Sequence, residues 1–194
     1  MYSQNEEEKY ILKAVGYKTD GRFLDIGAYD GKTFSNTLAL IERGWEGVMV
    51  EPGLHAFESL LARHGRNQRL ALVHAAVGYG DRLAAFWDSF EPYGTTHVPN
   101  VRKWKHLAHF SHGYLTSLIT LEELFKQFPE PIDVLSIDTE GTSVDLFLHF
   151  PLPLFLPAVL CVEHDGRVDE CLEHAGRYGY KLVYQSAENL VLVR

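Results

Sequence analysis

The stretch from Asp25 to Gly31, DIGAYDG, combines two aspartates with two glycines. Glycine permits a positive φ and a close backbone approach, so this stretch is expected to form a tight turn whose free N–H groups and following helix receive a ligand. The glycine spacing is not the G-x-G-x-x-G of dinucleotide sites, and Asp25 and Asp30 would repel a pyrophosphate. The pattern favours a ligand with an ammonium or sulfonium charge. The alternative is an ordinary turn that Asp25 caps.

Glu51 follows this turn by about 20 residues, an interval typical of nucleoside sites. It ends the apolar run VMVE and precedes Pro52. An acid at the carboxyl end of such a strand can accept hydrogen bonds from both ribose hydroxyls. Ala76 and Val77, in HAAVG, are small residues at a third strand end and leave room for a flat base. Three strand ends are therefore expected to meet at one nucleoside-sized site.

The elements that position these residues alternate between short apolar runs and helical patterns, which is typical of an α/β fold with a parallel sheet. The last two runs are too close for a crossover, so they must form an antiparallel hairpin. We predict a Rossmann-like, doubly wound, mostly parallel seven-stranded sheet with a C-terminal antiparallel hairpin strand. The predicted strands are residues 22–26, 47–51, 70–76, 133–138, 158–163, 181–186 and 189–193, and the predicted helices are 35–44, 52–65, 120–128 and 167–179.

Length and charge narrow the classes of protein that fit. A chain of 194 residues predicts one domain, residues 1–194. The net charge of -8 argues against a basic face for nucleic acid, so no nucleic-acid partner is expected. The longest apolar run, 150–162, contains three prolines, which indicates a loop leading into a buried strand rather than a membrane helix. Cys161 and Cys171 are expected to be reduced core thiols. We expect a cytoplasmic protein with no membrane partner.

Residues 88–117 do not fit the alternating pattern. The segment has weak periodicity and is rich in histidine and aromatic residues. About thirty residues without regular structure indicate a functional loop or disorder, and aromatic residues argue against disorder. We predict an inserted His/aromatic-rich segment that faces the substrate. Within it, Trp104 is surrounded by Arg102, Lys103 and Lys105, which fits either an anionic ligand or a solvated helix.

Five segments together resemble the FkbM family of class I methyltransferases, which use S-adenosylmethionine. They are YSQNEEE, FLDIGAYDGKTFSNTLALIERGWEGVMVEP, VHAAVG, LITLEELF and IDVLSIDTEG, in the order of the family. The resemblance covers most of the chain except the His-rich segment. Two positions depart from the family pattern: Tyr29 stands where asparagine is usual, and residues 141–143, GTS, replace a small residue and a glutamate.

The resemblance implies a role for individual residues. It assigns Asp25, Gly27 and Gly31 to the methionine part of S-adenosylmethionine, Glu51 to the ribose, and Ala76 with Val77 to the adenine edge, and it places Asp138 and Glu140 beside the transferred methyl group. The full set of expected cofactor-binding residues is Asp25, Gly27, Ala28, Tyr29, Asp30, Gly31, Ser35, Asn36, Glu51, Pro52, Ala76, Val77 and Asp138.

Methyl transfer to a hydroxyl would require a base to remove the proton. The expected catalytic residues are Asp138, Glu140, His164 and His112, and the other loop candidates are His97, His106 and His109. No metal ligand is assigned. A divalent metal is possible but not favoured; Asp138, Glu163, His164 and Asp165 would supply its ligands.

Three functions remain open on the sequence. The first is O-methylation of a small-molecule or glycan acceptor by a monomer or homodimer. The second is a non-catalytic partner-binding module that retains the fold, because Ser143 replaces a family glutamate. The third is modification of nucleic-acid bases, which the charge disfavours. A nicotinamide-dependent oxidoreductase is the alternative for the fold, but its glycine spacing is missing.

Overall fold

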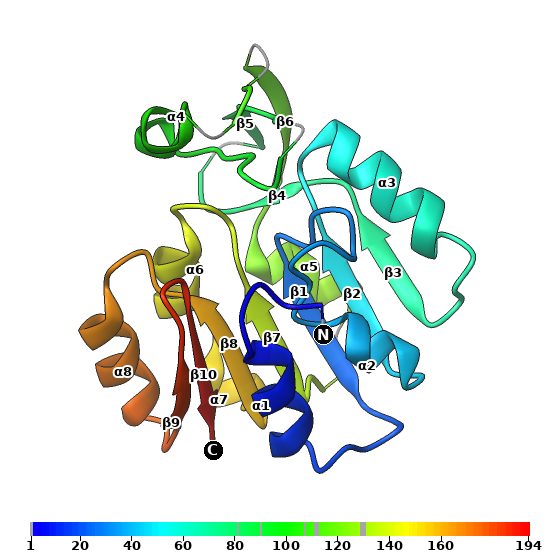
Figure 1. Cartoon of the computed structure of the whole chain (residues 1–194), viewed down its shortest axis with the longest axis vertical. Helices are drawn as coiled ribbons and strands as arrows, with labels where there is room; N and C mark the ends of the chain where they lie inside the picture. The colour runs from blue at the N-terminus through cyan, green and yellow to red at the C-terminus, as the bar shows by residue number, and fades with distance from the viewer. Residues whose placement is uncertain (1, 81, 90, 107, 111–112, 129–130) are drawn as a thin grey trace.

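The computed structural model describes residues 2–80, 82–89, 91–106, 108–110, 113–128 and 131–194. It contains a seven-stranded sheet in the order β3-β2-β1-β7-β8-β10-β9 and a three-stranded sheet in the order β4-β6-β5. Helices cover both faces of the large sheet, and the small sheet lies beyond one end of it (Figure 1).

The bounds of the elements follow. The large sheet consists of β1 (Arg22–Ile26), β2 (Glu46–Val50), β3 (Leu70–Val73), β7 (Val134–Ile137), β8 (Val159–Glu163), β9 (Lys181–Gln185) and β10 (Asn189–Val193), and the small sheet of β4 (Ala76–Val77), β5 (Leu83–Phe86) and β6 (Tyr114–Ile119). The helices are α1 (Glu7–Ala14), α2 (Leu38–Glu42), α3 (Leu54–His64), α4 (Val98–Trp104), α5 (Leu121–Gln127), α6 (Ser143–His149), α7 (Leu152–Phe155) and α8 (Val168–Gly176).

The predicted doubly wound sheet and its terminal hairpin are confirmed. Strands β3, β2, β1, β7 and β8 pair in parallel, and β10 pairs antiparallel with both β8 and β9. The reversed strand is thus last in the chain but lies between β8 and β9. The register aligns Asp25 of β1 with Met49 and Ser136. The residues that follow β1, β2, β7 and β8 therefore meet at one edge.

Alternating side chains of the central strands bury both faces of the sheet. On β1, Leu24 and Ile26 pack in one buried cluster with α5, α6 and α8, whereas Phe23 packs in a second cluster with α1, α2 and α3. Strands covered on both faces read as apolar throughout, which explains why their positions were predictable. Cys161 and Cys171 are both buried and unpaired, as expected.

Several elements differ from the predictions. The strand predicted at 70–76 ends at Val73, because Ala76 and Val77 pair with β6 in the small sheet. The helix predicted at 35–44 spans only Leu38–Glu42. Helices α1 and α6 were not predicted, and the loop predicted in the proline-rich run contains the short helix α7. Pro151 precedes α7 and Pro153 lies in its first turn, where proline is tolerated.

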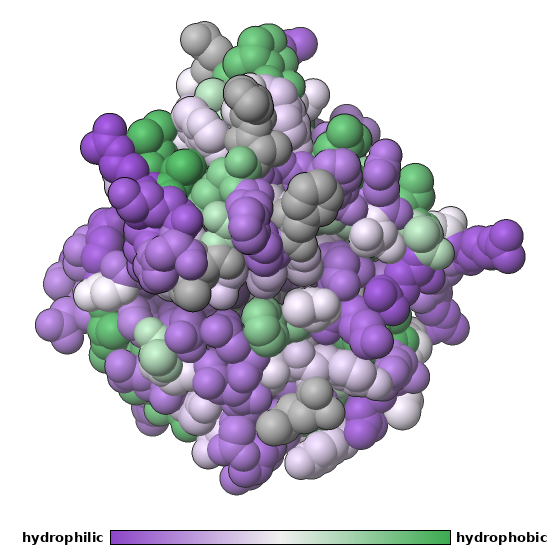
Figure 2. All heavy atoms as spheres, turned by 45° about the horizontal axis from the view of Figure 1, so that its top comes forward, coloured by the Kyte–Doolittle hydropathy of each residue, from purple (hydrophilic) through white to green (hydrophobic). Residues whose placement is uncertain are grey.

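The segment 88–117 is more regular than predicted. It contains α4 and the start of β6, which pairs with β5 and β4. The periodicity is weak because Thr116 is the one buried residue of β6, so this strand has no alternating apolar face. On the antiparallel strands β5 and β6, Leu83 and Leu115 are exposed. Figure 2 shows apolar groups at the top of a face that is otherwise largely polar.

Among the helices in the described ranges, none has the length and apolarity needed to cross a bilayer.

Candidate active site

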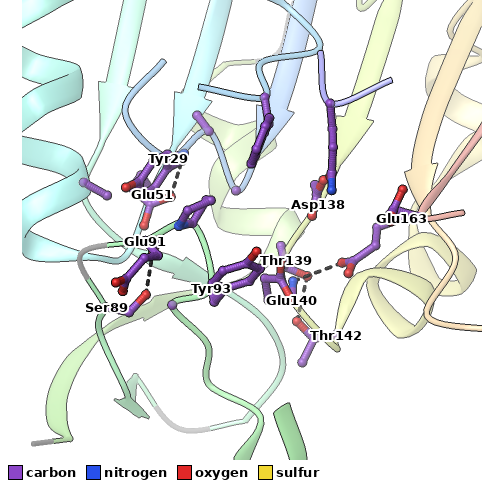
Figure 3. A pocket seen from close by; sticks show the side chains of 18 of the residues that line it. Tyr29, Glu51, Ser89, Glu91, Tyr93, Asp138, Thr139, Glu140, Thr142 and Glu163 are labelled. Atoms are coloured by element: carbon purple, nitrogen blue, oxygen red, sulfur yellow. Dashed lines mark hydrogen bonds between the residues drawn. The ribbon is translucent and has the colours of Figure 1, made fainter. Parts of the chain in front are cut away.

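A cavity of about 440 Å³ lies at the carboxyl edge of the large sheet. Loops after β1, β2, β7 and β8 form its base, and part of the segment 88–117 forms its opposite wall. Figure 3 shows Tyr29 and Glu51 on one side, Asp138, Glu140 and Glu163 on the other, and Tyr93 between them. Open α/β sheets bind ligands at this edge, so the position agrees with a functional site.

Gly27 allows two loops to cross at the base of the cavity. Its φ is +90°, and a Cβ there would lie 1.7 Å from the Asp138 carbonyl oxygen. The N–H groups of Gly27 and Ala28 both donate to the Val50 carbonyl oxygen, at 2.9 and 3.1 Å. The Tyr29 N–H donates to Glu51. The expectation of free N–H groups in this turn is therefore wrong: sheet and loop acceptors already engage them.

Asp25 is buried at the end of β1, on the cavity wall. The Thr37 hydroxyl donates to its Oδ2 at 2.6 Å. Burial raises the pKa of Asp25 to about 6, although the hydrogen bond from Thr37 opposes this shift. A positively charged ligand would stabilise the ionised form of this carboxyl.

Ser35 and Asn36 line the cavity beside Asp25. Ser35 Oγ accepts hydrogen bonds from the N–H groups of Thr37 and Leu38, at 3.3 and 3.0 Å. Asn36 Nδ2 reaches Ser136 Oγ at 3.5 Å, while its buried Oδ1 has no hydrogen-bond partner among the described residues. A buried amide oxygen without a partner is costly, so this atom suits a ligand donor.

Asp30 and Gly31 do not line the cavity. The Asp30 carboxylate accepts from the N–H groups of Lys32 and Thr33, at 2.8 and 2.6 Å, and so holds the turn. Gly31 has φ +68°, and a Cβ there would lie 2.6 Å from Leu60.

Glu51 lies on the cavity wall with Pro52. Its two oxygens accept from the N–H groups of Gly53 and Tyr29, at 2.7 and 2.9 Å. Burial raises the pKa of Glu51 to about 7, against the effect of these two hydrogen bonds. The backbone thus fixes the orientation of a buried carboxylate at the end of β2.

Ala76 and Val77 are not among the described residues that line the cavity. Both are buried, and Val77 packs in the cluster that includes Leu121 and Leu124. The cavity wall nearest Glu51 comes instead from Phe86, Asp88 and neighbouring residues of the small sheet. The predicted adenine contact stays a prediction.

Asp138, Glu140 and Glu163 form the acidic cluster, in which carboxylate oxygens of all three lie within 4.8 Å of one another. Burial, followed by repulsion from Glu163, raises the pKa of Asp138 well above its usual value and that of Glu140 to about 8. The same causes raise the pKa of Asp165 to about 7. With pKa values of about 8 and 7, Glu140 and Asp165 can hold or release a proton near neutral pH.

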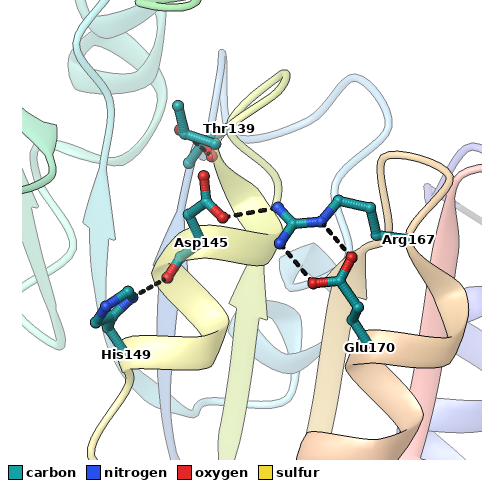
Figure 4. A network of polar contacts seen from close by, with 6 residues as sticks. Thr139, Asp145, His149, Arg167 and Glu170 are labelled. Atoms are coloured by element: carbon teal, nitrogen blue, oxygen red, sulfur yellow. Dashed lines mark hydrogen bonds and ion pairs between the residues drawn. The ribbon is translucent and has the colours of Figure 1, made fainter.

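Ser143 stands where the family pattern has glutamate, and its hydroxyl donates to Glu163 Oε2 at 2.6 Å. The Glu140 N–H donates to the same oxygen at 3.0 Å. The substitution therefore supports the acidic cluster rather than breaking it. Helix α6, which begins at Ser143, is tied to α8 by Arg167, whose guanidinium contacts Asp145 and Glu170 at 2.7 Å (Figure 4).

The segment 88–117 contacts the acidic cluster directly. Trp104 Nε1 donates to Glu140 Oε2 at 2.9 Å, and the Thr95 hydroxyl donates to the Glu140 carbonyl oxygen at 2.6 Å. Trp104 stacks on Tyr93 with centroids 4.9 Å apart. These contacts hold Glu140 at φ +54°, a strained value for this residue.

Of the histidines considered as bases, His164 lines the cavity, whereas His97, His106 and His109 do not. His164 is buried, and its Nδ1 accepts from the Gly166 N–H at 3.0 Å. Its Nε2 has no hydrogen-bond partner in the part of the chain that the structure describes. His112 lies outside the described residues.

Several cavity residues were not assigned from the sequence, namely Gln4, Phe34, Asp88, Ser89, Glu91, Tyr93, Trp104, Thr139 and Thr142. The composition of 88–117 singled out the segment that supplies five of them. No spacing rule identifies which of its side chains face the cavity, because contacts distant in sequence hold this region, such as the hydrogen bond from Trp104 to Glu140.

Residues 25–181 match the family model described as "Methyltransferase FkbM domain". No curated protein matches the chain. A precorrin-6y C5,15-methyltransferase from Geobacter metallireducens has a similar structure, with TM-score 0.53 and 11% identity over 99% of this chain and 88% of that chain. An S-adenosylhomocysteine-bound methyltransferase from Podospora anserina has TM-score 0.53 and 10% identity over 98% and 79%.

At these identities the structural neighbours establish the fold alone. The family model spans most of the chain, including Asp25, Glu51, Asp138 and Glu140. The family and fold expected from the motifs are thus confirmed: the chain belongs to the FkbM family of S-adenosylmethionine-dependent methyltransferases.

Proposed function

We propose that this methyltransferase transfers a methyl group to a hydroxyl of a small molecule or sugar. The observation that carries the proposal is a single cavity with two chemically different ends. Glu51 lies on one side and the acidic cluster on the other (Figure 3), and Asp25 and Asn36 line the cavity beside Ser136. This layout provides one place for a nucleoside cofactor and another for an acceptor that must lose a proton.

Glu51, Asn36 and Asp25 suit S-adenosylmethionine. Glu51 is buried, oriented by two backbone N–H groups, and able to accept further hydrogen bonds from a ribose diol. Asn36 Oδ1 lacks a partner among the described residues, and Asp25 is an acid suited to a cationic ligand. When bound, the cofactor supplies a methyl group activated by positive sulfur.

The chain itself would orient the acceptor and take its proton. Asp138 and Glu140 are the proposed bases. The pKa of Glu140, about 8, suits proton transfer near neutral pH, and the Asp138 carboxyl lines the cavity within the acidic cluster. Trp104 orients one oxygen of Glu140, leaving the other for the acceptor hydroxyl. His164 is the third proposed catalytic residue, since its Nε2 lacks a partner among the described residues and the residue lines the cavity.

The proposed cofactor contacts fall into two groups. We assign direct contact to the residues that line the cavity, which are Asp25, Gly27, Ala28, Tyr29, Ser35, Asn36, Glu51, Pro52 and Asp138. Asp30 and Gly31 would act by shaping the turn, and Ala76 with Val77 by packing behind it.

The chain would work as one methyltransferase domain in which 88–117 faces the acceptor. Tyr93 and Trp104 support that role, because both line the cavity. Localisation in the cytoplasm, use of no metal, and a monomeric or homodimeric state stay predictions.

Calorimetric binding of S-adenosylmethionine and S-adenosylhomocysteine tests the proposal. We expect micromolar binding that Glu51→Ala abolishes. Glu46→Ala is the matched control, because Glu46 is an exposed acid at the opposite end of the same strand. An acceptor screen with a labelled methyl donor then tests the transfer to oxygen. Absence of cofactor binding to the folded natural chain would refute the proposal.

A further inference from the structure

The end of the cavity opposite Glu51 combines an aromatic ring with the acidic cluster, in which Glu163 is buried and Asp138 and Glu140 are partly buried. Its walls include Tyr93, Glu140, Glu163 and His164. We propose that this subsite selects an acceptor bearing a protonated amine beside its hydroxyl, as in an amino sugar or amino alcohol. This inference rests on the proposed function and specifies the substrate class of the same site.

The subsite has unused hydrogen-bond capacity at Glu140. The Glu140 N–H and the Ser143 hydroxyl both donate to Glu163 Oε2, and the neighbouring Asp138 and Asp165 carboxyls also hydrogen-bond to Glu163. The only donor to the Glu140 carboxylate among the described residues is Trp104, which reaches its Oε2. The other oxygen of Glu140 can therefore accept from an ammonium or hydroxyl group of a ligand.

The chain supplies little positive charge to balance these acids. Among the described residues that line the cavity, Lys103 is the one lysine or arginine. Its ammonium lies 4.2 Å from the centre of the Trp104 ring. Buried carboxylates are costly unless a positive group or hydrogen-bond donors compensate them. A cationic ligand would provide that compensation, whereas a carboxylate or phosphate on the acceptor would be repelled.

Tyr93 supports an organic cation as the occupant. Its ring is stacked on Trp104, with an interplanar angle of 28°, and lies between Glu51 and Glu140 in the cavity (Figure 3). An aromatic face can bind an ammonium group or the C–H face of a sugar. A divalent ion is the competing occupant of the acidic cluster, but the ring would contribute nothing to its oxygen shell.

His164 provides an independent indication of a polar ligand. The residue is only 8% exposed and lines the same cavity. Its Nε2 has no hydrogen-bond partner among the described residues, while Nδ1 is fixed by the Gly166 N–H. An unpartnered ring nitrogen at this depth suits a hydroxyl or amine of the acceptor.

Ligand-observed NMR on the full chain saturated with S-adenosylhomocysteine tests the inference. The probes are glucosamine, N-acetylglucosamine, glucose and glucuronic acid near neutral pH, where the glucosamine amine is largely protonated. We expect glucosamine to bind at least about tenfold more tightly than N-acetylglucosamine or glucose, and glucuronic acid not to bind. Glu163→Gln and Tyr93→Ala should each abolish the preference for glucosamine.

Glu122→Gln is the control, because this exposed acid on α5 is paired with Lys126 away from the cavity. Equal binding of glucosamine and glucose would overturn the inference, as would preferential binding of glucuronic acid. Binding of Mn²⁺ alone that Glu163→Gln removes would also overturn it, in favour of the ion. If S-adenosylhomocysteine itself does not bind, the proposed function fails instead, so the two failures are distinguishable.

Discussion

Gly27 is the residue at which the backbone of the loop after β1 lies closest against the loop after β7. A Cβ at this position would meet the Asp138 backbone at 1.7 Å, and backbone cannot move aside as a side-chain tip can. We expect Gly27→Ala to lower the free energy of unfolding by roughly 2–4 kcal/mol, from strain at positive φ and overpacking. Urea unfolding measures this.

Gly179 gives the matched control for this experiment. Its φ is +86°, close to that of Gly27, but no atom of the described residues lies within 4 Å of a Cβ built there. Gly179→Ala should cost only the backbone strain, about 1 kcal/mol. If both substitutions cost the same, the crossing of the two loops is not what requires glycine at position 27.

Glu140 is expected to make the stability of the protein depend on pH. Its folded-state pKa, about 8, lies above the ordinary value of 4.5. The folded chain therefore retains a proton that the unfolded chain releases, so this contribution is complete below about pH 4.5 and is lost as pH rises through about 8. Glu140→Gln should raise stability relative to the natural chain more at the upper end of this range than at the lower end.

Chemical unfolding at both ends of this pH range checks the prediction. In Glu140→Gln the side-chain amide oxygen can still accept the Trp104 N–H, so the change removes the charge and preserves the contact. Glu122→Gln, at an exposed position, should show no such pH dependence. A gain from Glu140→Gln that is equal at both pH values would mean that burial does not shift this carboxyl.

At the scale of elements, the start of α5 is defined by a capping box. The Thr120 side chain accepts from the Glu123 N–H at 3.1 Å, and the Glu123 carboxylate accepts from the Thr120 N–H at 3.0 Å. We expect Thr120→Ala to lower the free energy of unfolding by about 1 kcal/mol, and Thr120→Ser to be nearly neutral. Equal losses in the two variants would show that the hydroxyl does not cap the helix.

The same helix shows what the sequence could predict. The T-x-x-E pattern of α5 and the apolar strands of the large sheet are local signals, and both were found. Strand β6 was not predicted, because its pairing with β5 joins residues on either side of the segment around α4. Tyr93 lies in the loop between the bridged residues Trp87 and Thr95 and stacks on Trp104. The acids at the strand ends can be recognised from local sequence. The opposite wall of the cavity, formed by part of the segment 88–117, depends on contacts distant in sequence.

The site prediction divides in the same way. Asp25, Glu51 and Asp138 follow directly from strand ends, and all three line the cavity. Ala76 and Val77 were placed by the same rule, but the chain leaves the large sheet at Val73 before reaching them. The structure therefore places Ala76 and Val77 in the small sheet, and their contact with adenine stays a prediction.

At the scale of the whole molecule, cofactor binding should stabilise the fold, because the cavity is assembled from loops after four strands and from the segment 88–117. A ligand that binds only the folded state at a hundred times its dissociation constant adds about 2.7 kcal/mol of stability. For a chain of this size we expect S-adenosylhomocysteine to raise the Tm by roughly 5–10 °C.

The variants decide whether such a shift comes from this site. Glu51→Ala should remove the shift, whereas Glu46→Ala, at the amino end of the same strand, should retain it. Hydrogen exchange adds a second readout, since the amides of Tyr29 and Gly53 bond to Glu51 and should become better protected on binding. A thermal shift that persists unchanged in Glu51→Ala would mean that the cofactor binds away from Glu51. Loss of a direct contact should weaken binding and so reduce the stabilisation.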